Sequence, residues 1–338
     1  MTTASSLPPD MTGTNRTSLR EQISRLWAFN WPLTLSVLVY LVLTPVYIVA
    51  AIADPRLITG APAFVKPLKF VVSIGIYSAT FLWLLTLVEG RRRWVQIAAN
   101  VTSIGMLVEI VLITMQAIRG TASHFNAATE FDSTVFGIMG LVITVVATMN
   151  LLLGIWLLFQ RLPEPVTAWG IRLGVLISFL GMTVAFLMTS GPTPTQRAQM
   201  EAGGEPIAIG AHSVNVEDGG PGLPFLGWNT EGGDLRAPHF IGLHAMQILP
   251  LLAFALNGTA ARRRWQQGQR TVLIIIGGLG YLGGLVLLTW QALRGQPVFA
   301  PDALTLSAYA ALTGMVALAS GVVTITPLFV RSPKLSTQ

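Results

Sequence analysis

Eight apolar segments, each long enough for an α-helix to cross a bilayer, constrain the fold of this chain more than any other feature. They cover residues 31–53, 67–88, 94–118, 134–160, 169–190, 239–257, 271–293 and 303–329. A helix needs about 20 apolar residues to cross roughly 30 Å of hydrocarbon. Only 11% of the residues are charged, against about 25% in soluble domains. Because lipid offers backbone groups no partner, and because no period-2 alternation indicates a barrel, the sequence predicts an all-α integral membrane protein with eight transmembrane helices.

Three short patterns occur twice in the same order and predict an internal duplication. Trp-x-x-x-Leu-x-Val-Leu lies at 31–38 and 169–176, and Arg-Arg-Arg-Trp lies at 91–94 and 262–265. Gln-Ala-x-Arg-Gly follows at 116–120 and 291–295. Each copy would hold four helices, an even number, so both copies enter the membrane in the same direction. We therefore predict two parallel four-helix repeats.

The basic residues predict the orientation. With the N-terminus cytoplasmic, the inner segments hold 14 of the 21 Lys and Arg residues and the outer segments hold 7. The inner residues are Arg16, Arg20, Arg25, Arg91, Arg92, Arg93, Arg161, Arg172, Arg262, Arg263, Arg264, Arg270, Arg331 and Lys334, and the outer ones are Arg56, Lys66, Lys69, Arg119, Arg197, Arg236 and Arg294. The positive-inside rule then predicts that both termini are cytoplasmic, in a bacterial cytoplasmic (inner) membrane.

The chain divides accordingly. We expect a disordered cytoplasmic tail over 1–25, the first repeat over 26–161, the second repeat over 162–331 and a cytoplasmic tail over 332–338. The second repeat contains a long extracytoplasmic loop, residues 191–238. Its apolar residues predict a folded lid over the bundle rather than a linker; they are Leu223, Phe225, Leu226 and Trp228.

The two Gln-Ala-x-Arg-Gly boxes allow a structural and a functional interpretation. In the structural one, Gly120 and Gly295 adopt the left-handed conformation just past a helix end, and Arg119 and Arg294 offset the helix dipole there. The arginines would also pair with acids at the start of the next helix, Asp132 and Asp302.

In the functional interpretation, the pseudo-symmetry brings Arg119 and Arg294 to one outward vestibule. Lys66, Lys69 and Arg236 would lie at the same level, and several cations around a partly dry cavity attract a carboxylate or phosphate. Gln116, Gln291, Glu109 and Tyr77 would orient this small anion or relay a proton. Glu109 falls within a transmembrane segment, where an ionisable side chain is expensive and functional by default. The predicted function is transport or sensing of an anion, without catalysis.

Two alternatives remain open. A membrane oxidoreductase would hold haem b or quinone near the outer face, with His244, His239 and His124 as the candidate haem ligands. A structural subunit of a membrane complex would use the outer loop for docking. A zinc site at His212 and His239 lacks a diagnostic ligand spacing. The chain has no cysteine, its basic residues lie at helix ends rather than in a nucleic-acid footprint, and no phosphate-binding loop or nucleophile motif occurs.

Overall fold

The structure, a computed structural model, describes residues 18–326. The long helices are α2 (Trp31–Ala53), α3 (Val65–Leu85), α4 (Arg92–Arg119), α5 (Glu130–Phe159), α6 (Pro165–Met188), α8 (Arg236–Leu256), α10 (Gln267–Leu293) and α11 (Ala303–Ile325). The short elements are α1 (Leu19–Phe29), β1 (Leu57–Ile58), β2 (Ala61–Pro62), α7 (Pro194–Glu201), β3 (Ser213–Val214), β4 (Gly233–Asp234) and α9 (Thr259–Arg264). Within the described residues, eight helices are long and apolar enough to cross a membrane, which confirms the predicted multi-pass all-α architecture.

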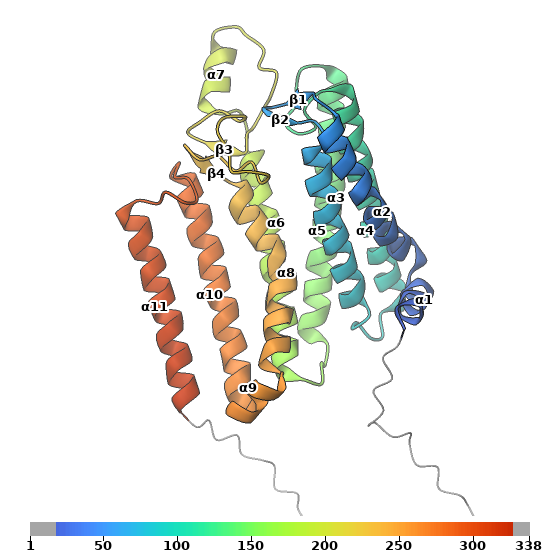
Figure 1. The fold of residues 1–338 in the computed structure, drawn as a ribbon, viewed down its shortest axis with the longest axis vertical. Coiled ribbons are helices and arrows are strands. Elements are labelled where there is room, and N and C mark those ends of the chain that lie inside the picture. Colours follow the sequence, from blue (N-terminus) through green and yellow to red (C-terminus); the bar gives the residue numbers. More distant parts are fainter. Residues whose placement is uncertain (1–17, 327–338) are drawn as a thin grey trace, which may run out of the picture.

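The long helices form two side-by-side groups (Figure 1). The first half comprises α2 to α5, and the second half comprises α6, α8, α10 and α11. In the first half, α2 packs on α3, α4 packs on α5, and α4 also contacts α2 and α3. In the second half, α6 packs on α8, α10 packs on α11, and α10 also contacts α6 and α8. The halves meet where α5 packs on α6. There Arg172 of α6 donates to the carbonyl oxygens of Leu157 and Gln160 at the end of α5, at 3.0 and 2.9 Å.

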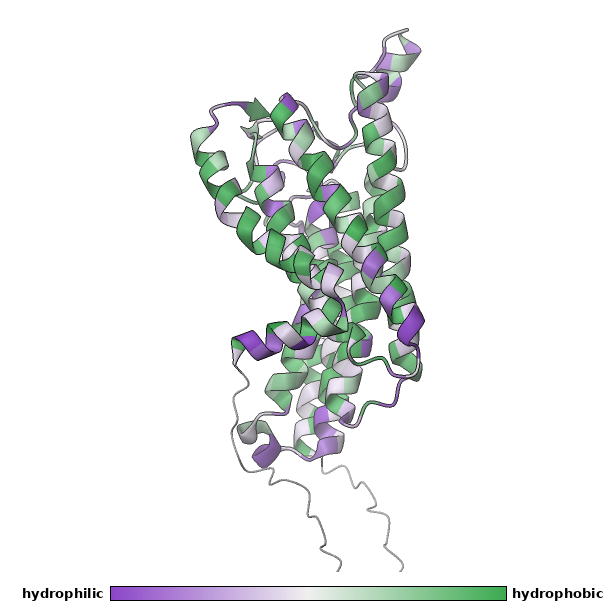
Figure 2. Cartoon of the chain, turned by 90° about the vertical axis from the view of Figure 1, so that its right-hand side faces the viewer, coloured by the Kyte–Doolittle hydropathy of each residue, from purple (hydrophilic) through white to green (hydrophobic). Residues whose placement is uncertain are grey.

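Helix α1 lies across the direction of the long helices (Figure 2). It begins at a capping box in which Ser18 and Glu21 bond reciprocally, a motif that satisfies the first free amides of a helix. Leu26 and Phe29 pack against the core of the first half, whereas Leu19 and Trp27 stay exposed. Most of the predicted tail over 1–25 lies outside the described residues, and its described part is helical from Leu19. The tail predicted over 332–338 also lies outside them.

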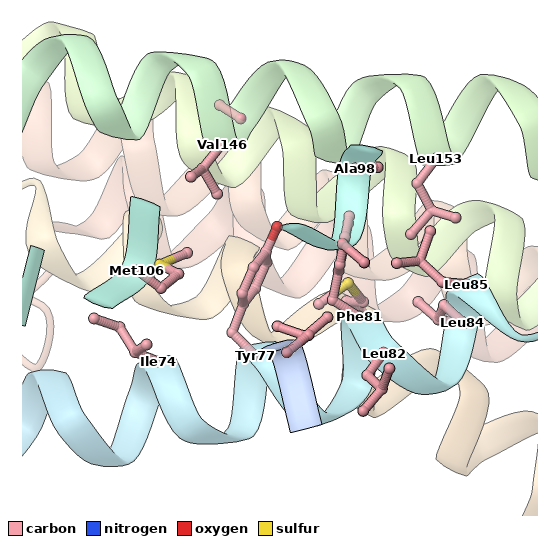
Figure 3. Close-up of a cluster of buried hydrophobic side chains, with 14 of the residues drawn as sticks. Ile74, Tyr77, Phe81, Leu82, Leu84, Leu85, Ala98, Met106, Val146 and Leu153 are labelled. Carbon is pink, nitrogen blue, oxygen red and sulfur yellow. The ribbon is translucent and has the colours of Figure 1, made fainter. Parts of the chain in front are cut away.

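The largest core consists of buried apolar side chains of α2, α3, α4 and α5, together with Ile171, Val175 and Met182 of α6 and Met246 of α8 (Figure 3). Phe81, Leu84 and Leu85 of α3 are completely buried there, against Leu153 of α5. In the second half the closest packing is between α6 and α8. A Cβ atom on Gly181 would lie 2.4 Å from the carbonyl carbon of Gly242, so the two backbones touch, as small residues permit in membrane helices.

Connections at one end of the bundle fold together into a cap, made of residues 54–64, 120–129 and 189–235. Loop 120–129 pairs with the second half, because the amide of Ala127 donates to Ile207 and that of Ile209 donates to Phe125, both at 2.9 Å. A Cβ atom on Gly60 would lie 2.9 Å from the carbonyl oxygen of Gly219. The cap therefore joins the connections of the two halves, and it holds most of the loop predicted as a lid.

Candidate functional site

Three cations gather beneath the cap, and we call Lys66, Lys69 and Arg236 the cationic cluster. Lys66 and Lys69 lie in the first two turns of α3, and Arg236 is the first residue of α8. Neither helix has a side-chain N-cap. The N-terminus of a helix already carries partial positive charge from the macrodipole. Three cations at two such ends therefore create an excess of positive charge that the helices themselves do not favour.

One turn of the cap closes over two of these cations. Lys69 Nζ donates to the carbonyl oxygen of Leu226 at 3.1 Å, and an Arg236 guanidinium nitrogen donates to that of Gly227 at 2.5 Å. A Cβ atom on Gly227 would lie 3.7 Å from Lys69 Nζ and 3.9 Å from Arg236. Gly227 also has a positive φ of 68°, so glycine suits this turn for two reasons. Carbonyl dipoles solvate the cations here but supply no net negative charge.

Two carboxylates lie near the cluster, and both are already saturated with donors. Asp234 is fully buried and accepts from Arg236 at 2.6 and 2.9 Å, as well as from the amides of Asn229 and Arg236. Asp218 accepts from the ring of His212 at 2.7 Å and from the amides of His212 and Ser213. These two acids hold the cap together and leave the cluster positively charged.

Lys66 is the uncompensated member of the cluster. Its side chain is partly buried and makes no hydrogen bond or ion pair with any residue between 18 and 326. Arg236, Lys69 and Asp218 are the charges that act on it most strongly, so it faces two cations and one acid. A charged ammonium that is withdrawn from water needs a partner of opposite sign. The structure therefore presents a cation that an anionic ligand would complete.

Three imidazoles, those of His124, His212 and His239, surround the same region. Each uses Nδ1 within the protein, toward Ser123 Oγ at 3.0 Å, Asp218 at 2.7 Å and the carbonyl oxygen of Gly181 at 2.8 Å, respectively. A carbonyl oxygen only accepts, so Nδ1 of His239 carries a proton and its Nε2 is the acceptor in the neutral ring. Nε2 of neutral His212 is likewise an acceptor, because its Nδ1 donates to Asp218. Only His124, whose Nδ1 can accept from Ser123 Oγ, can present Nε2 as a donor.

Two of these imidazoles belong to the cap and are held neutral. Burial, together with Lys66, His212 and His239, keeps the pKa of His124 well below its usual range. Burial also lowers the pKa of His212, against the opposing effect of Asp218. For Asp218, burial works against ionisation, but the donors from His212 and Ser213 hold the pKa of its carboxyl well below its usual range. At neutral pH these two imidazoles therefore add no positive charge to the site.

Aromatic side chains enclose the imidazoles. Ring centroids are 5.5 Å apart for Phe70 and His124, 4.8 Å for Phe125 and His212, and 5.4 Å for Phe125 and Phe136. Phe125 is buried and has a φ of +60°, a strained conformation for a bulky residue. Such strain concentrates at functional sites. All four non-glycine residues with positive φ in residues 18–326 belong to the cap; they are Thr59, Phe125, Asn215 and Phe225.

Arg119, which we predicted at the ligand, has an in-chain partner. It donates to buried Asp132 and to Gln116, both at 2.5 Å, and its guanidinium lies 4.6 Å from the ring centre of Phe131. Gln116 donates to the same carboxylate at 2.8 Å. Gly120 follows with a φ of 74°. These contacts fit the structural interpretation of the first box.

The second box has a corresponding arrangement. Arg294 donates to Asp302 at 2.7 and 3.1 Å and to Thr305 at 2.7 Å, and Gly295 has a φ of 73°. Gln291 donates to the carbonyl oxygen of Pro297 and accepts from Tyr309. The C-terminal ends of α4 and α10 lie on opposite sides of the bundle (Figure 1). The structure thus does not bring the two arginines into one vestibule.

The remaining predicted residues lie deeper in the first half. Tyr77 is buried in α3 and stacks on Phe81, with ring centroids 5.7 Å apart (Figure 3). Glu109 is buried in α4, and its Oε1 atom has no hydrogen-bond partner within the described chain. The structure places neither Lys69 nor Arg119 in an ion pair with Glu109. Glu109 and Tyr77 are separate from the contacts that define the cationic cluster.

The histidines considered as haem ligands are not presented together on one helix face. His239 and His244 are five residues apart on α8, about 140° around the helix axis. His239 faces α6 through Gly181, whereas the ring of His244 lies 4.3 Å from that of Phe240. In the stretch from 18 to 326, no three His, Asp or Glu side chains form a group suited to a metal ion.

Sequence reasoning missed the roles of Asp218, Asp234 and His212 in this site. A signal was available for Asp234, because Asp234-Leu-Arg236 has the same Asp-x-Arg spacing as Asp54-Pro-Arg56. Both pairs form the same two-residue ion pair, with closest N–O distances of 2.6 Å. The loop position of Asp218 gave no such indication, since its partners come from folding of the cap.

Protein-family models, curated proteins and solved structures contain no match to this chain. The functional conclusion therefore rests on the geometry of the cationic cluster and the cap.

Proposed function

We propose that this protein is an eight-helix protein of the bacterial inner membrane that binds a small anion beneath the cap, for transport or sensing. Lys66, Lys69 and Arg236 supply the positive charge, and the cap covers the bound ligand. Arg119 and Arg294 serve as helix-end ion pairs in this proposal. Gln116 and Gln291 support those ends, and the cationic cluster supplies the charged contacts to the anion.

The observation that carries the proposal is the partly buried side chain of Lys66, which has no partner within residues 18–326. It lies near Lys69 and Arg236 at two helix N-termini. Of the two nearby acids, Asp234 pairs with Arg236 and Asp218 is bound by His212, so neither contacts Lys66. Helix N-termini also favour anions through their free amides. A carboxylate or phosphate at Lys66 would offset charge repulsion that the protein alone leaves in place.

The proposed ligand class follows from the surroundings. A neutral His124 ring whose Nδ1 accepts from Ser123 can supply an Nε2 donor, and Phe70, Phe125 and Trp228 supply apolar contact around the charge. Charge-assisted hydrogen bonds to a carboxylate or phosphate are about twice as strong as neutral ones. We expect phosphate or a small carboxylate to bind better than a halide, which lacks several directional acceptors.

Calorimetric titration of the full-length protein in detergent tests this function. Inorganic phosphate, succinate and benzoate are titrated against the wild type, Lys66→Gln and Arg197→Gln. Arg197 is an exposed cation on α7, outside the cluster, and serves as the matched control. Binding that Lys66→Gln abolishes and Arg197→Gln preserves supports the proposal. Failure of all anions to bind the wild type, or equal binding by both variants, would contradict it. Uptake into proteoliposomes then separates transport from sensing.

The proposed parallel repeats are supported by two features. The two halves share one pattern of helix contacts. The two Gln-Ala-x-Arg-Gly boxes also end their helices alike, since Thr121 donates to the carbonyl oxygen of Gln116 at 3.1 Å and Gln296 donates to that of Gln291 at 3.2 Å. The proposed orientation, with the cap outside and both termini cytoplasmic, is supported by the excess of arginines at the end opposite the cap.

A further inference from the structure

A groove of about 670 Å³ lies between the two halves at the end of the bundle opposite the cap. Helices α3 and α8 form its long walls, and the start of α6 and α9 close its lower end. At its upper end, Gln247 of α8 donates to Thr80 of α3 at 3.1 Å. This groove is distinct from the cationic cluster, which lies toward the opposite ends of the same two helices.

The walls of the groove are apolar and accessible. Trp83 is 42% exposed, Leu251 is 63% exposed and Phe254 is 78% exposed, and all three line the groove. Trp83 and Leu251 belong to helices that are apolar enough to cross the membrane. A surface of this kind at membrane depth suits a hydrocarbon chain that enters sideways from the bilayer.

The lower end of the groove carries an uncompensated positive charge. Arg262 of α9 lines the groove, is exposed and has no ion pair or hydrogen bond from its side chain in the described chain. The acid at this end, Glu164, already accepts three hydrogen bonds at its Oε2 atom, from Thr167 twice and from Asn257 at 2.6 Å. The unbonded Oε1 atom of Glu164 is buried. Arg262 therefore offers its charge to a headgroup, and Glu164 does not compete for it.

We infer that this groove binds an anionic phospholipid, with one acyl chain between α3 and α8 and the phosphate at Arg262. The apolar walls of the groove suit the acyl chain of the lipid, and charge complementarity at Arg262 selects an anionic headgroup. Arg263 and Arg264 follow in the sequence and raise the local positive potential. The lipid would fill the space between the two halves where the protein itself leaves them apart.

The test is retention of lipid by the full-length protein, taken from nanodiscs of equal parts phosphatidylglycerol and phosphatidylcholine and measured by native mass spectrometry. The wild type should retain phosphatidylglycerol in preference to phosphatidylcholine. Arg262→Gln should reduce this preference about fivefold, the effect expected for one arginine at a membrane surface. Arg263→Gln is the matched control, because the neighbouring arginine is equally exposed but does not line the groove.

A second variant tests whether the acyl chain of the lipid binds in the groove. Leu251→Trp adds bulk to an exposed wall residue and should reduce retention of both lipids without changing the preference. Equal retention of the two lipids by the wild type would overturn the headgroup assignment, as would equal losses in Arg262→Gln and Arg263→Gln. Unchanged total retention in Leu251→Trp would overturn the groove as the binding place. Anion titration at the cap is a separate readout and should be unaffected by either variant.

Discussion

Lys69 and Arg236 come from different halves of the bundle and donate to the consecutive carbonyl oxygens of Leu226 and Gly227. One turn of the cap is thus held by one cation from each half. Lys66, the third cation, has no such contact. Any anion that reaches Lys66 would lie beside the bonds that keep the cap closed. The state of the cap and occupancy of the site are therefore expected to depend on each other.

Removing the charge of Lys66 should change stability and binding in opposite directions. Without ligand, Lys66→Gln removes repulsion from Lys69 and Arg236, so the melting temperature should rise. Phosphate or carboxylate affinity should fall by tenfold to a hundredfold, since a charge-assisted hydrogen bond contributes about 1.5–3 kcal/mol. Lys66→Arg keeps the charge and should retain binding. A lower melting temperature in Lys66→Gln would show that Lys66 stabilises the empty protein instead.

The arginines of the two boxes should affect stability unequally. Arg119→Ala leaves the carboxylate of Asp132, whose side chain is 4% exposed, without its cation. We expect a clear loss of stability, because the buried carboxylate would keep only the neutral donors of Gln116 and Thr129. Arg294→Ala should have a much smaller effect, because its partner Asp302 is 43% exposed and surface pairs contribute little. Thermal unfolding measures both changes. If either variant loses anion binding while remaining folded, the arginine belongs to the ligand site.

The transmembrane helices could be predicted from the sequence because length and apolarity alone determine which segments cross a bilayer. The prediction of 31–53 matches α2 (Trp31–Ala53), and that of 94–118 falls within α4 (Arg92–Arg119). Helix α1 was missed because its apolar positions, Ile23 and Leu26 among them, are too few to span a membrane. They show only the three-residue spacing of an interfacial helix.

The candidate site was only partly predictable. The sequence placed Lys66, Lys69 and Arg236 at one level, because helix ends follow from the apolar segments. The sequence could not show whether Arg119 and Arg294 form ion pairs at helix ends or contact a ligand. That outcome depends on which carboxylates come within reach of each arginine after folding. The contacts of Lys69 and Arg236 with Leu226 and Gly227 depend on a turn in an irregular loop. No periodic pattern encodes such a turn.

Stability should fall in mildly acidic solution because of the buried imidazoles of the cap. Burial lowers the pKa values of His124 and His212 in the folded protein. In the unfolded chain, the pKa of a histidine is about 6.5. The unfolded state therefore binds more protons below about pH 6.5. The free energy of unfolding should decrease there by up to about 1.4 kcal/mol per pH unit for each imidazole.

Melting temperatures between pH 5 and pH 8 measure this effect. His124→Gln, which cannot take up the proton, should show a shallower decline than the wild type below pH 6.5. An identical pH profile in the two proteins would mean that His124 is already accessible to protons in the folded state.

The contact between α6 and α8 should be intolerant of any side chain at Gly181. Gly181→Ala would place a methyl group 2.4 Å from the backbone of Gly242 and should cost about 1–3 kcal/mol through overpacking. It should also disturb the bond from His239 to the carbonyl oxygen of Gly181, and so weaken anion binding. Gly140→Ala in α5 is the control, because no atom lies within 4 Å of its added methyl. Equal melting temperatures for the two variants would show that α6 and α8 can separate without cost.

The proposed orientation can be tested directly because the chain has no cysteine. Arg197→Cys places a single thiol on exposed α7 of the cap, and Arg263→Cys places one on α9 at the opposite end. With the cap outside, a membrane-impermeant maleimide should label Arg197→Cys in intact spheroplasts and Arg263→Cys only after lysis. Both positions are surface arginines, so neither substitution should affect folding. The reverse labelling pattern would place the cap and its cationic cluster in the cytoplasm. The anion would then be a cytoplasmic one, and the groove at Arg262 would open to the outer leaflet.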